Sequence, residues 1–320
     1  MKKSVVSLLV MSLVLLALTA CSEKKKEAEF PSKTIRIFIP FSAGGAADLS
    51  VRALQPKLEK ELGQSVEVID KPGGSGALAM NEVIKSAADG YTLGFTGVGP
   101  AVITPLSNDV GYTPEDFATV GAHMLIPYVL VVPYDSKYEN LSQFLDEVKA
   151  NPNKIRIGTP GPASTSYLAL QQLAEKQGLQ FQIVPFNGGV DTINALLGSN
   201  VEAIVNVDSE LPAYLNDKKF KTLTVLSDKR STVVPDTPTS AEQGIDFTIN
   251  SVPPNGLYAP KGTPANVIAK LEKAIKAATE DEEVKKTFQN IHINPEFTSA
   301  ADFRKAIDDS YAYYKEILKK

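Results

Sequence analysis

The stretch "IRIFIPFSAGGAADLSVRALQPKL", residues 35–58, joins an apolar run to a helical pattern through a glycine-rich turn. The β-branched run predicts a strand, and Leu54, Leu58 and Leu62 recur at the spacing of one helix face. A helix N-terminus carries unpaired N–H groups and a partial positive charge, so it favours an anion. Glycine lets a ligand approach the backbone closely. Gly44 and Gly45 therefore form either an anion cradle or only a tight turn.

The same alternation continues along the chain. It predicts an α/β fold with mostly parallel sheets. Further strand patterns are "SVEVID", "YTLGFTG", "YVLVVP", "KIRIGTP", "FQIVPF" and "VEAIVNV", and helical patterns cover residues 79–88, 141–150, 165–177 and 190–198.

Two helices near the C-terminus have recognisable starts. Thr263 is a candidate N-cap with Pro264 at the first helical position. Ser299 and Asp302 have the spacing of a capping box. The last helix has one apolar face that either packs on the fold or binds a partner, made of Phe303, Ile307, Tyr311, Tyr314 and Leu318.

Three more junctions resemble the first one. "VPFNGGVDTI", "GTPGPASTSYLAL" and "DKPGGSGALAMNEV" each lead from a predicted strand into a predicted helix. Such junctions gather at the carboxyl ends of strands, where ligands bind in α/β folds. Each alone is also explained by a turn or a helix cap, but four together favour a shared anion site. The loops do not match a nucleotide-binding motif, because Gly-Lys-Ser/Thr and G-x-G-x-x-G are both absent.

The sequence offers little support for catalysis. His123 and His292 stand in unremarkable contexts, and no H-E-x-x-H, paired metal ligands or G-x-S-x-G are present. Asp48, Asp191 and Asp208 could form an acid/base pair, although capping suits the first two better. We therefore predict a binding protein without catalytic residues, metal or cofactor. The net charge of -4 gives no reason to expect nucleic acid as a partner.

The N-terminus predicts export. Lys2 and Lys3 precede an apolar stretch that is too short for a stable membrane span. The residues before Cys21 resemble a bacterial lipobox, so we expect a signal peptide over 1–20, lipid on Cys21 and a polar tether over 21–29. A lone buried thiol is the alternative for Cys21. The lipid would hold the protein at a membrane surface without spanning the membrane.

From about Phe30 onward the chain resembles the solute receptors of tripartite tricarboxylate transporters, also called Bug receptors. The resemblance is carried by "IRIFIPFSAGGAAD", "VIDKPGGSGALAMNEVIKSAADGYTLGFT", "VGYTPEDFATVG", "VPFNGGVDTINALLGSNVEAIV", "SDKRSTVVPDTPTSAEQG" and "LYAPKGTPANVIAKL". It implies a two-lobed periplasmic-binding-protein clamshell (Venus flytrap), each lobe a mostly parallel sheet flanked by helices. Lobe 1 would comprise residues 30–126 and 252–320, and lobe 2 residues 127–251. Crossings are expected near Ile126-Pro127 and Ser251-Val252, with Pro127, Pro253 and Pro254 stiffening the hinge.

The resemblance also implies a small organic carboxylate as ligand, held largely by main-chain groups, small hydroxyls and ordered water. The residues that it assigns to the site are Phe41, Ala43, Gly44, Gly45, Gly73, Gly74, Thr96, Ser164, Ser166, Asn187, Gly188 and Gly189. Two positions depart from the family pattern. Tyr167 replaces a common His, and Val205-Asn206-Val207 replaces a common Phe-Asp-Asn. We expect the distal end of the ligand near Asn206 and Asp208.

These inferences predict a monomeric, exported, lipid-anchored receptor that captures a carboxylate and delivers it to membrane subunits of a transporter. A receptor that signals to a membrane histidine kinase through the same clamshell is the alternative. An enzyme ranks third, because it would need turnover of a bound carboxylate.

Overall fold

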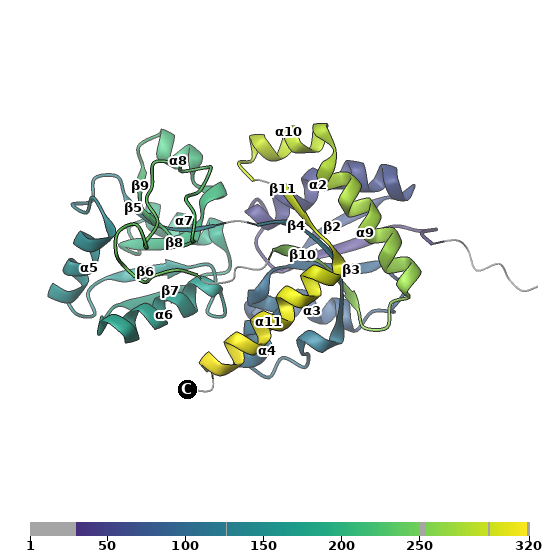
Figure 1. Ribbon diagram of the computed structural model, residues 1–320, viewed down its shortest axis with the longest axis horizontal. Helices are drawn as coiled ribbons and strands as arrows, with labels where there is room; N and C mark the ends of the chain where they lie inside the picture. The colour runs from purple at the N-terminus through teal and green to yellow at the C-terminus, as the bar shows by residue number, and fades with distance from the viewer. Residues whose placement is uncertain (1–29, 126, 250–253, 294, 319–320) are drawn as a thin grey trace, which may run out of the picture. The chain divides into compact units, whose positions relative to one another are not determined.

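The computed structural model describes residues 30–125, 127–249, 254–293 and 295–318. Residues 33–320 fold as one unit. It contains two β-sheets, each flanked by helices (Figure 1). The predicted signal peptide, Cys21 and the whole tether lie outside the described ranges. So do four of the expected hinge residues, Ile126, Ser251, Val252 and Pro253.

The first sheet is mixed and has the strand order β11-β4-β10-β3-β1-β2. β1 pairs in parallel with β2 and with β3, whereas β10 pairs antiparallel with β3 and β4, and β11 pairs antiparallel with β4. The strands are β1 (Ile35–Ile39), β2 (Val66–Asp70), β3 (Thr92–Thr96), β4 (Phe117–Met124), β10 (Asn255–Pro260) and β11 (Pro295–Thr298).

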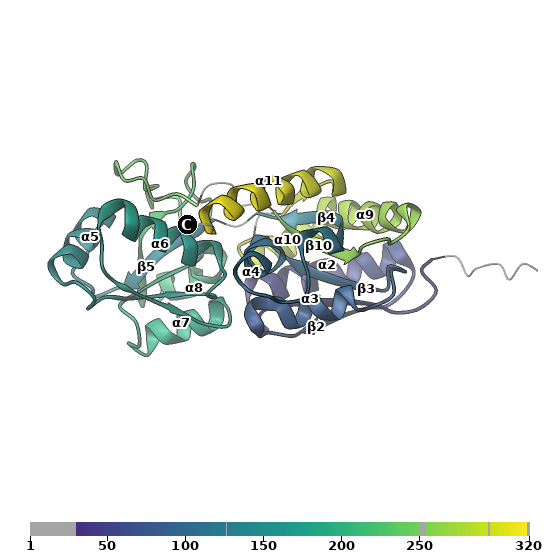
Figure 2. The same ribbon diagram turned by 90° about the horizontal axis from the view of Figure 1, so that it is seen from below.

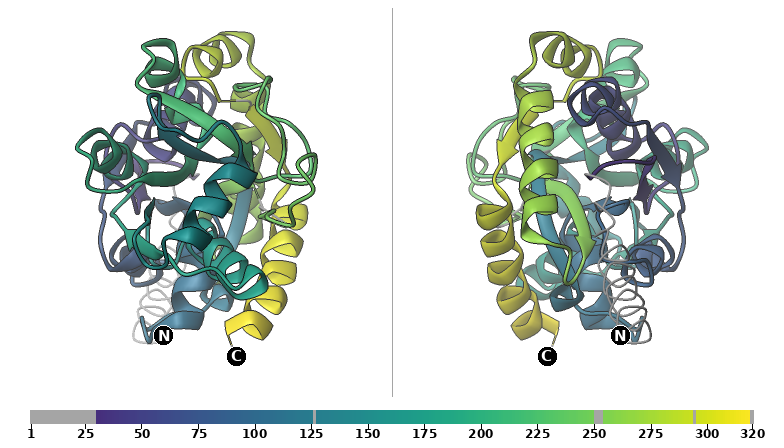
Figure 3. Two further views of the ribbon diagram at one scale, coloured as in Figure 1. Left: turned by 90° about the vertical axis from the view of Figure 1, so that its left-hand side faces the viewer. Right: turned by 90° about the vertical axis from the view of Figure 1, so that its right-hand side faces the viewer.

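Helices cover both faces of the first sheet. β2 and β3 lie on opposite sides of β1, so right-handed crossovers place the connecting helices α2 and α3 on opposite faces. The right-hand panel of Figure 3 shows α9 in light green and α11 in yellow running along this sheet. The elements are α2 (Ala46–Leu62), η1 (Gly74–Gly76), α3 (Ala77–Ile84), η2 (Gly99–Ile103), α4 (Thr104–Ser107), η3 (Pro114–Asp116), α9 (Ala265–Glu280), α10 (Glu282–Asn290) and α11 (Ala300–Leu318).

The second sheet is also mixed, with the order β7-β6-β8-β5-β9. β6 is parallel to β7 and β8, and β5 is antiparallel to β8 and β9. Figure 2 shows α6 and α7 on opposite sides of it. Its elements are β5 (Tyr128–Pro133), α5 (Leu141–Ala150), β6 (Arg156–Thr159), α6 (Thr165–Gln177), β7 (Gln182–Pro185), α7 (Gly189–Leu197), β8 (Ala203–Val207), η4 (Asp208–Glu210), α8 (Pro212–Asn216) and β9 (Phe220–Val225).

Separate apolar clusters hold these layers together. One packs α5 and α6 on the second sheet through Phe144, Leu170 and their neighbours. Another packs α7 on its opposite face through Ile193 and Leu196. A third includes Phe303 and Ile307 of α11 against the first sheet. Successive side chains of β5 point to opposite faces of the sheet, so this apolar strand contributes residues to the clusters on both faces.

At the start of the last helix, Ser299 and Asp302 form one bond of the predicted capping box, together with a bond between their side chains. Asp302 N–H donates to Ser299 Oγ (3.1 Å), and Ser299 Oγ–H donates to Asp302 Oδ2 (2.6 Å). Phe303, Ile307 and Tyr314 are buried, and Tyr311 and Leu318 pack against the same cluster. The apolar face of this helix is therefore used for packing on the fold.

The α/β fold class is confirmed, and three local expectations need correction. The sheets are mixed rather than mostly parallel, because β4, β5, β9, β10 and β11 join by antiparallel pairing. The helix expected over 79–88 is α3, which ends at Ile84, and Ser86 N–H then bonds Val83 C=O three residues back. Pro264 occupies the N-cap of α9, and the Thr263 hydroxyl instead donates to Pro260 C=O (2.8 Å).

Within the described parts of the chain, no helix combines the length and apolar character needed to cross a membrane.

Candidate functional site

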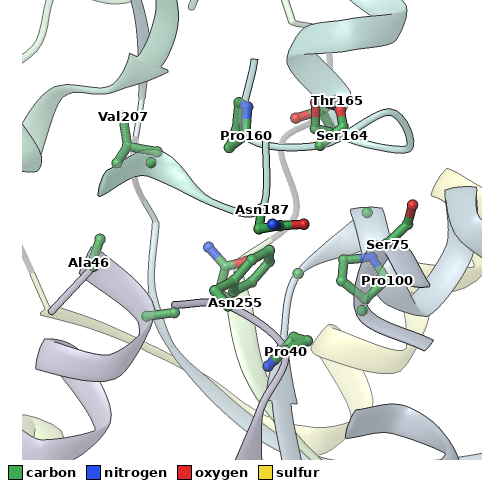
Figure 4. Close-up of a pocket in the computed structure, with 18 of the residues that line it drawn as sticks. Pro40, Ala46, Ser75, Pro100, Pro160, Ser164, Thr165, Asn187, Val207 and Asn255 are labelled. Carbon is green, nitrogen blue, oxygen red and sulfur yellow. Dashed lines mark hydrogen bonds between the residues drawn. The ribbon is translucent and has the colours of Figure 1, made fainter. Parts of the chain in front are cut away.

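The N-terminal ends of α2, α6 and α7 and the glycine turn before α3 open on one pocket. Its cavity volume is about 140 Å³. Figure 4 shows Asn187 between Ser164 and Thr165 on one side and Pro40 and Asn255 on another. The structure therefore brings together the four loops that the sequence singled out.

The first loop follows the carboxyl end of β1. Gly44 has a φ of +80°, which favours glycine, and its N–H donates to Asp48 Oδ2 (2.8 Å). Gly45 is the N-cap of α2 with a φ of -80°, so any residue could adopt its backbone. Ala46 N–H, one of the first N–H groups of the helix, donates to Glu210 Oε1 (2.8 Å). The loop thus already presents a backbone donor to a carboxylate.

The second loop needs glycine for close packing. Gly76 has a φ of +90°, and a Cβ there would lie 2.6 Å from Pro100 Cβ and 3.1 Å from Pro40 Cβ. Gly73 and Ser75 line the pocket beside it. Side chains larger than hydrogen at Gly76 would push these walls apart.

The third loop caps α6 with hydroxyl groups. Ser164 Oγ accepts the Tyr167 N–H (3.1 Å), donates to Gly161 C=O (2.7 Å) and lies 3.0 Å from Ser166 Oγ. Ser164 and Thr165 line the pocket. Tyr167, where the family often has His, packs partly buried against an apolar cluster.

The fourth loop precedes α7 and fits against Glu210. A Cβ on Gly189 would lie 1.8 Å from Glu210 Oε2 and 2.8 Å from Asn206 Oδ1. Asn206 Nδ2 donates to Glu210 Oε2 (3.0 Å) and to Gly189 C=O (3.2 Å). Burial raises the pKa of Glu210, and the hydrogen bonds from Ala46 N–H and Asn206 oppose that rise. Hydrogen at position 189 is what makes room for this carboxylate.

The three aspartates considered at the outset have different partners. Asp48 accepts the Gly44 N–H and pairs with Arg52. The Ser42 hydroxyl donates to Asp191 at 3.5 Å. Asp208 accepts the Ser231 hydroxyl, and burial raises its pKa to about 6. These contacts give each carboxylate a structural partner, and none of them links two of the aspartates.

His123 belongs to the core of the first sheet. Its ring stacks on Phe95 with centroids 5.0 Å apart and meets the edge of Phe288 at 6.0 Å. Burial lowers its pKa to about 3. Across the described residues, no group of three or more His, Cys, Asp or Glu is placed to hold a metal ion.

The structure separates the sequence-predicted residues into two sets. Residues in the pocket wall are Phe41, Gly45, Gly73, Ser164, Asn187, Gly189 and Asn206. Residues outside the wall are Ala43, Gly44, Gly74, Thr96, Ser166, Gly188 and Asp208. Ala43, Gly44, Gly74 and Gly188 belong to the same turns as wall residues. Binding by any of these residues stays a prediction.

The polar wall residues that sequence reasoning missed include Glu210 and Asn255. Asn255 begins β10, which is antiparallel to β3, so it lies beside the carboxyl end of β3. The Asn255 Oδ1 would be 1.9 Å from a Cβ on Gly97. Glu210 follows β8 in the short helix η4. An acidic residue just after a strand that ends at the pocket was the available signal for Glu210.

Comparisons with known proteins agree over most of the chain. Residues 50–320 match the family described as tripartite tricarboxylate transporter family receptor. A Cupriavidus necator protein described as "UPF0065 protein in gbd 5'region" is 31% identical over 306 residues, covering 95% of this chain and 92% of that protein.

Two solved structures show the same fold. Periplasmic binding protein BugD has a TM-score of 0.82 at 26% identity, covering 91% of this chain and 98% of that chain. MatC from Rhodopseudomonas palustris, solved with bound malate, has a TM-score of 0.81 at 25% identity, covering 90% of this chain and 100% of that chain. The chain therefore belongs to the tripartite tricarboxylate transporter receptor family, the Bug family, and has its two-lobed periplasmic-binding-protein clamshell fold.

Proposed function

We propose that this protein is an exported receptor that captures a small organic carboxylate and delivers it to membrane subunits of a tripartite transporter. The observation that carries the proposal is the meeting of the α2, α6 and α7 N-termini at one pocket. Among the described residues, its wall contains no Lys, Arg or His. Helix N-termini offer N–H donors and partial positive charge, so they can bind a carboxylate without a basic side chain.

The size and chemistry of the pocket suit a small acid. A water needs about 10–15 Å³ of such space, so about 140 Å³ holds roughly ten non-hydrogen atoms. Ser42, Ser164, Thr165, Asn187 and Asn255 supply hydroxyl and amide groups in the wall. The related MatC was solved with malate, a compound of this size and class.

The proposal includes the arrangement of the lobes. Lobe 1 comprises residues 30–126 and 252–320, and lobe 2 residues 127–251, with the crossings as hinges. Support comes from the strands, since those of the first sheet lie before residue 125 and after residue 254. Wall residues come from both sheets, so closure about the crossings would bury the ligand.

Binding, not turnover, is the proposed activity. The acids near the pocket are engaged by backbone N–H, Ser, Asn or Arg groups, and no nucleophile–base pair joins them in the described chain. Lipid on Cys21 would keep the receptor beside its membrane partner, as a single acyl-anchored chain that acts as a monomer.

A thermal-shift screen of the full chain tests the proposal. Dicarboxylates, tricarboxylates, amino acids and aromatic acids are compared with neutral sugars of similar size. A ligand at about 100 times its dissociation constant adds about 2.7 kcal/mol to the free energy of unfolding, so an acid should raise the melting temperature. Stabilisation by a sugar with none by any acid would overturn the carboxylate proposal.

A further inference from the structure

Glu210 is the one charged side chain among the described residues of the pocket wall. It sits in a pocket proposed to bind an anion, and Lys, Arg and His do not occur in that wall. A carboxylate here opposes a second carboxylate, because like charges in a poorly solvated site disfavour each other. The presence of Glu210 therefore restricts which acids the pocket accepts.

Contacts from the start of α2 and from strand β8 hold Glu210 in place. Its Oε1 accepts Ala46 N–H of α2 at 2.8 Å, and its Oε2 accepts Asn206 Nδ2 at 3.0 Å. A Cβ on Gly45 would lie 3.1 Å from Oε1, and one on Gly189 would lie 1.8 Å from Oε2. The carboxylate thus lies between the starts of α2 and α7, where both neighbouring positions are glycine.

A ligand carboxylate at the start of α2 competes with Glu210 for the Ala46 N–H. Two carboxylates would then share one end of the pocket, with no basic side chain in the wall to balance them. Among the described residues, Glu210 forms no salt bridge with a basic side chain. The nearby Tyr128 hydroxyl is neutral, and its pKa is raised, chiefly by burial. The positive charge must therefore come with the ligand.

We propose that the ligand is an amino acid or another aminocarboxylate, and that Glu210 is the residue that selects it by binding its ammonium group. This inference rests on the proposed function. An ammonium group has three donors, and a carboxylate has about four acceptor positions, of which Ala46 and Asn206 take two. The ligand carboxylate takes the helix N–H groups, and Glu210 turns to the ammonium group.

Calorimetric titration of the full chain tests this with matched ligand pairs. The pairs are L-aspartate with succinate, L-glutamate with glutarate, and 4-aminobutyrate with butyrate. A hydrogen bond to a charged group contributes about 1.5–3 kcal/mol. At least one amino acid should therefore bind about tenfold or more tightly than its amine-free partner.

Substitution of the acid should reverse this preference. Glu210→Gln keeps the side-chain shape and the acceptor for Ala46 N–H but removes the charge. This substitution should lower the affinity for the amino acid by about tenfold and raise the affinity for the amine-free acid. Asp191→Asn is the matched control, because Asp191 is beside Ser42 but outside the wall. In that variant, the ratio of the affinities for the amino acid and its amine-free partner should stay within about threefold of the wild-type ratio.

The outcomes separate this inference from the proposed function. If succinate, glutarate and butyrate each bind at least as tightly as their amino partners, the inference is overturned and a carboxylate receptor remains. Tighter binding of those acids toward low pH would show instead that a protonated Glu210 donates to the ligand, which also overturns it. An unchanged ratio in Glu210→Gln rules out Glu210 as the selecting residue. If none of these acids or other carboxylates binds, both proposals are wrong. The wild-type ratios stand even if a variant fails to fold.

Discussion

At the scale of single residues, two neighbouring acids after β8 have different surroundings. Asp208 is 2% exposed and accepts the Ser231 hydroxyl, away from the pocket wall. Glu210 reaches the wall and accepts a backbone N–H of α2. Burial raises the pKa of both groups, because transfer from water disfavours the charged form. One acid therefore affects stability, and the other is placed to affect ligand choice.

Asp208 should make stability depend on pH. Its pKa rises from 3.8 in the unfolded chain to about 6 in the folded one. Between these values the folded state binds more protons, so the free energy of unfolding falls as pH rises. The fall amounts to about 3 kcal/mol by pH 7. Asp208→Asn lacks this fall. Urea unfolding should therefore show the stability of this variant relative to wild type increasing by most of that amount from pH 4 to pH 7. The exposed Asp246→Asn is the control, and a constant difference for Asp208→Asn would contradict the prediction.

Gly45 and Arg52 distinguish backbone binding from an ion pair. Gly45 lies in the wall with a φ of -80°, so Gly45→Val crowds the pocket without backbone strain. We expect at least about a tenfold loss of affinity, or about 1.4 kcal/mol. Arg52 lies outside the wall and pairs with Asp48 and Asp70, so Arg52→Ala should cost less than about threefold. Calorimetry with the tightest acid, after circular dichroism confirms folding, measures both. Binding abolished by Arg52→Ala but kept by Gly45→Val would favour an ion pair.

At the scale of elements, helix starts build the site and helix faces build the core. The first turns of α2, α6 and α7 reach the pocket, whereas later turns of α2 bury Leu54, Leu58 and Leu62. α11 packs on the core, with Phe303 fully buried against Tyr258 at a centroid distance of 5.0 Å. Ligand affinity should therefore depend on the first turns of the helices, and stability on their buried faces.

Truncation of Phe303 should destabilise the fold strongly. Phe303→Ala removes a buried ring and leaves a cavity, which costs about 3–5 kcal/mol in the free energy of unfolding. Lys305→Ala on the same helix is the matched control, because its side chain is 74% exposed and solvent screens its ion pair with Asp309, so its loss should be small. Urea unfolding followed by circular dichroism measures both variants. Equal, small losses would mean that this face of α11 does not stabilise the core.

At the scale of the whole molecule, the direction of the strands determines which residues reach the pocket wall. Wall residues follow the carboxyl ends of parallel strands in each sheet, with Phe41 after β1 and Pro160 after β6. Antiparallel strands contribute the residues at their starts. Tyr128 of β5 pairs with Val207 at the end of β8, so it lies at the same edge. A pocket of this kind needs both sheets, and neither half of its wall is contiguous in the chain.

The proposed anchor predicts the mass of the mature protein. Intact mass spectrometry of protein purified from membranes should show loss of residues 1–20 and added lipid on Cys21. Cys21→Ser should carry no lipid and should leave the membrane fraction, because the lipid on Cys21 is the proposed anchor. Ser22→Ala is the control and should remain membrane-bound. An unlipidated wild-type Cys21 would contradict the anchor.

The sequence by itself determined the local elements and the loops that carry the site. Helices 141–150 and 165–177 have the bounds that periodicity predicts, since apolar spacing and capping residues act within a few positions. Glycine-rich turns after apolar strands marked the loops, and the family resemblance assigned Phe41, Gly45 and Gly189, which all reach the wall. These features depend on neighbours in the chain, so a single sequence records them.

Only the tertiary structure decided which strands pair antiparallel and what lies opposite each loop. Asn255 reaches the pocket because β10 inserts between β3 and β4, far from it in sequence. Glu210 meets the start of α2 across 164 positions of the chain. Such contacts depend on the register and packing of whole sheets, to which distant residues contribute together, so local propensity and spacing carry no record of them.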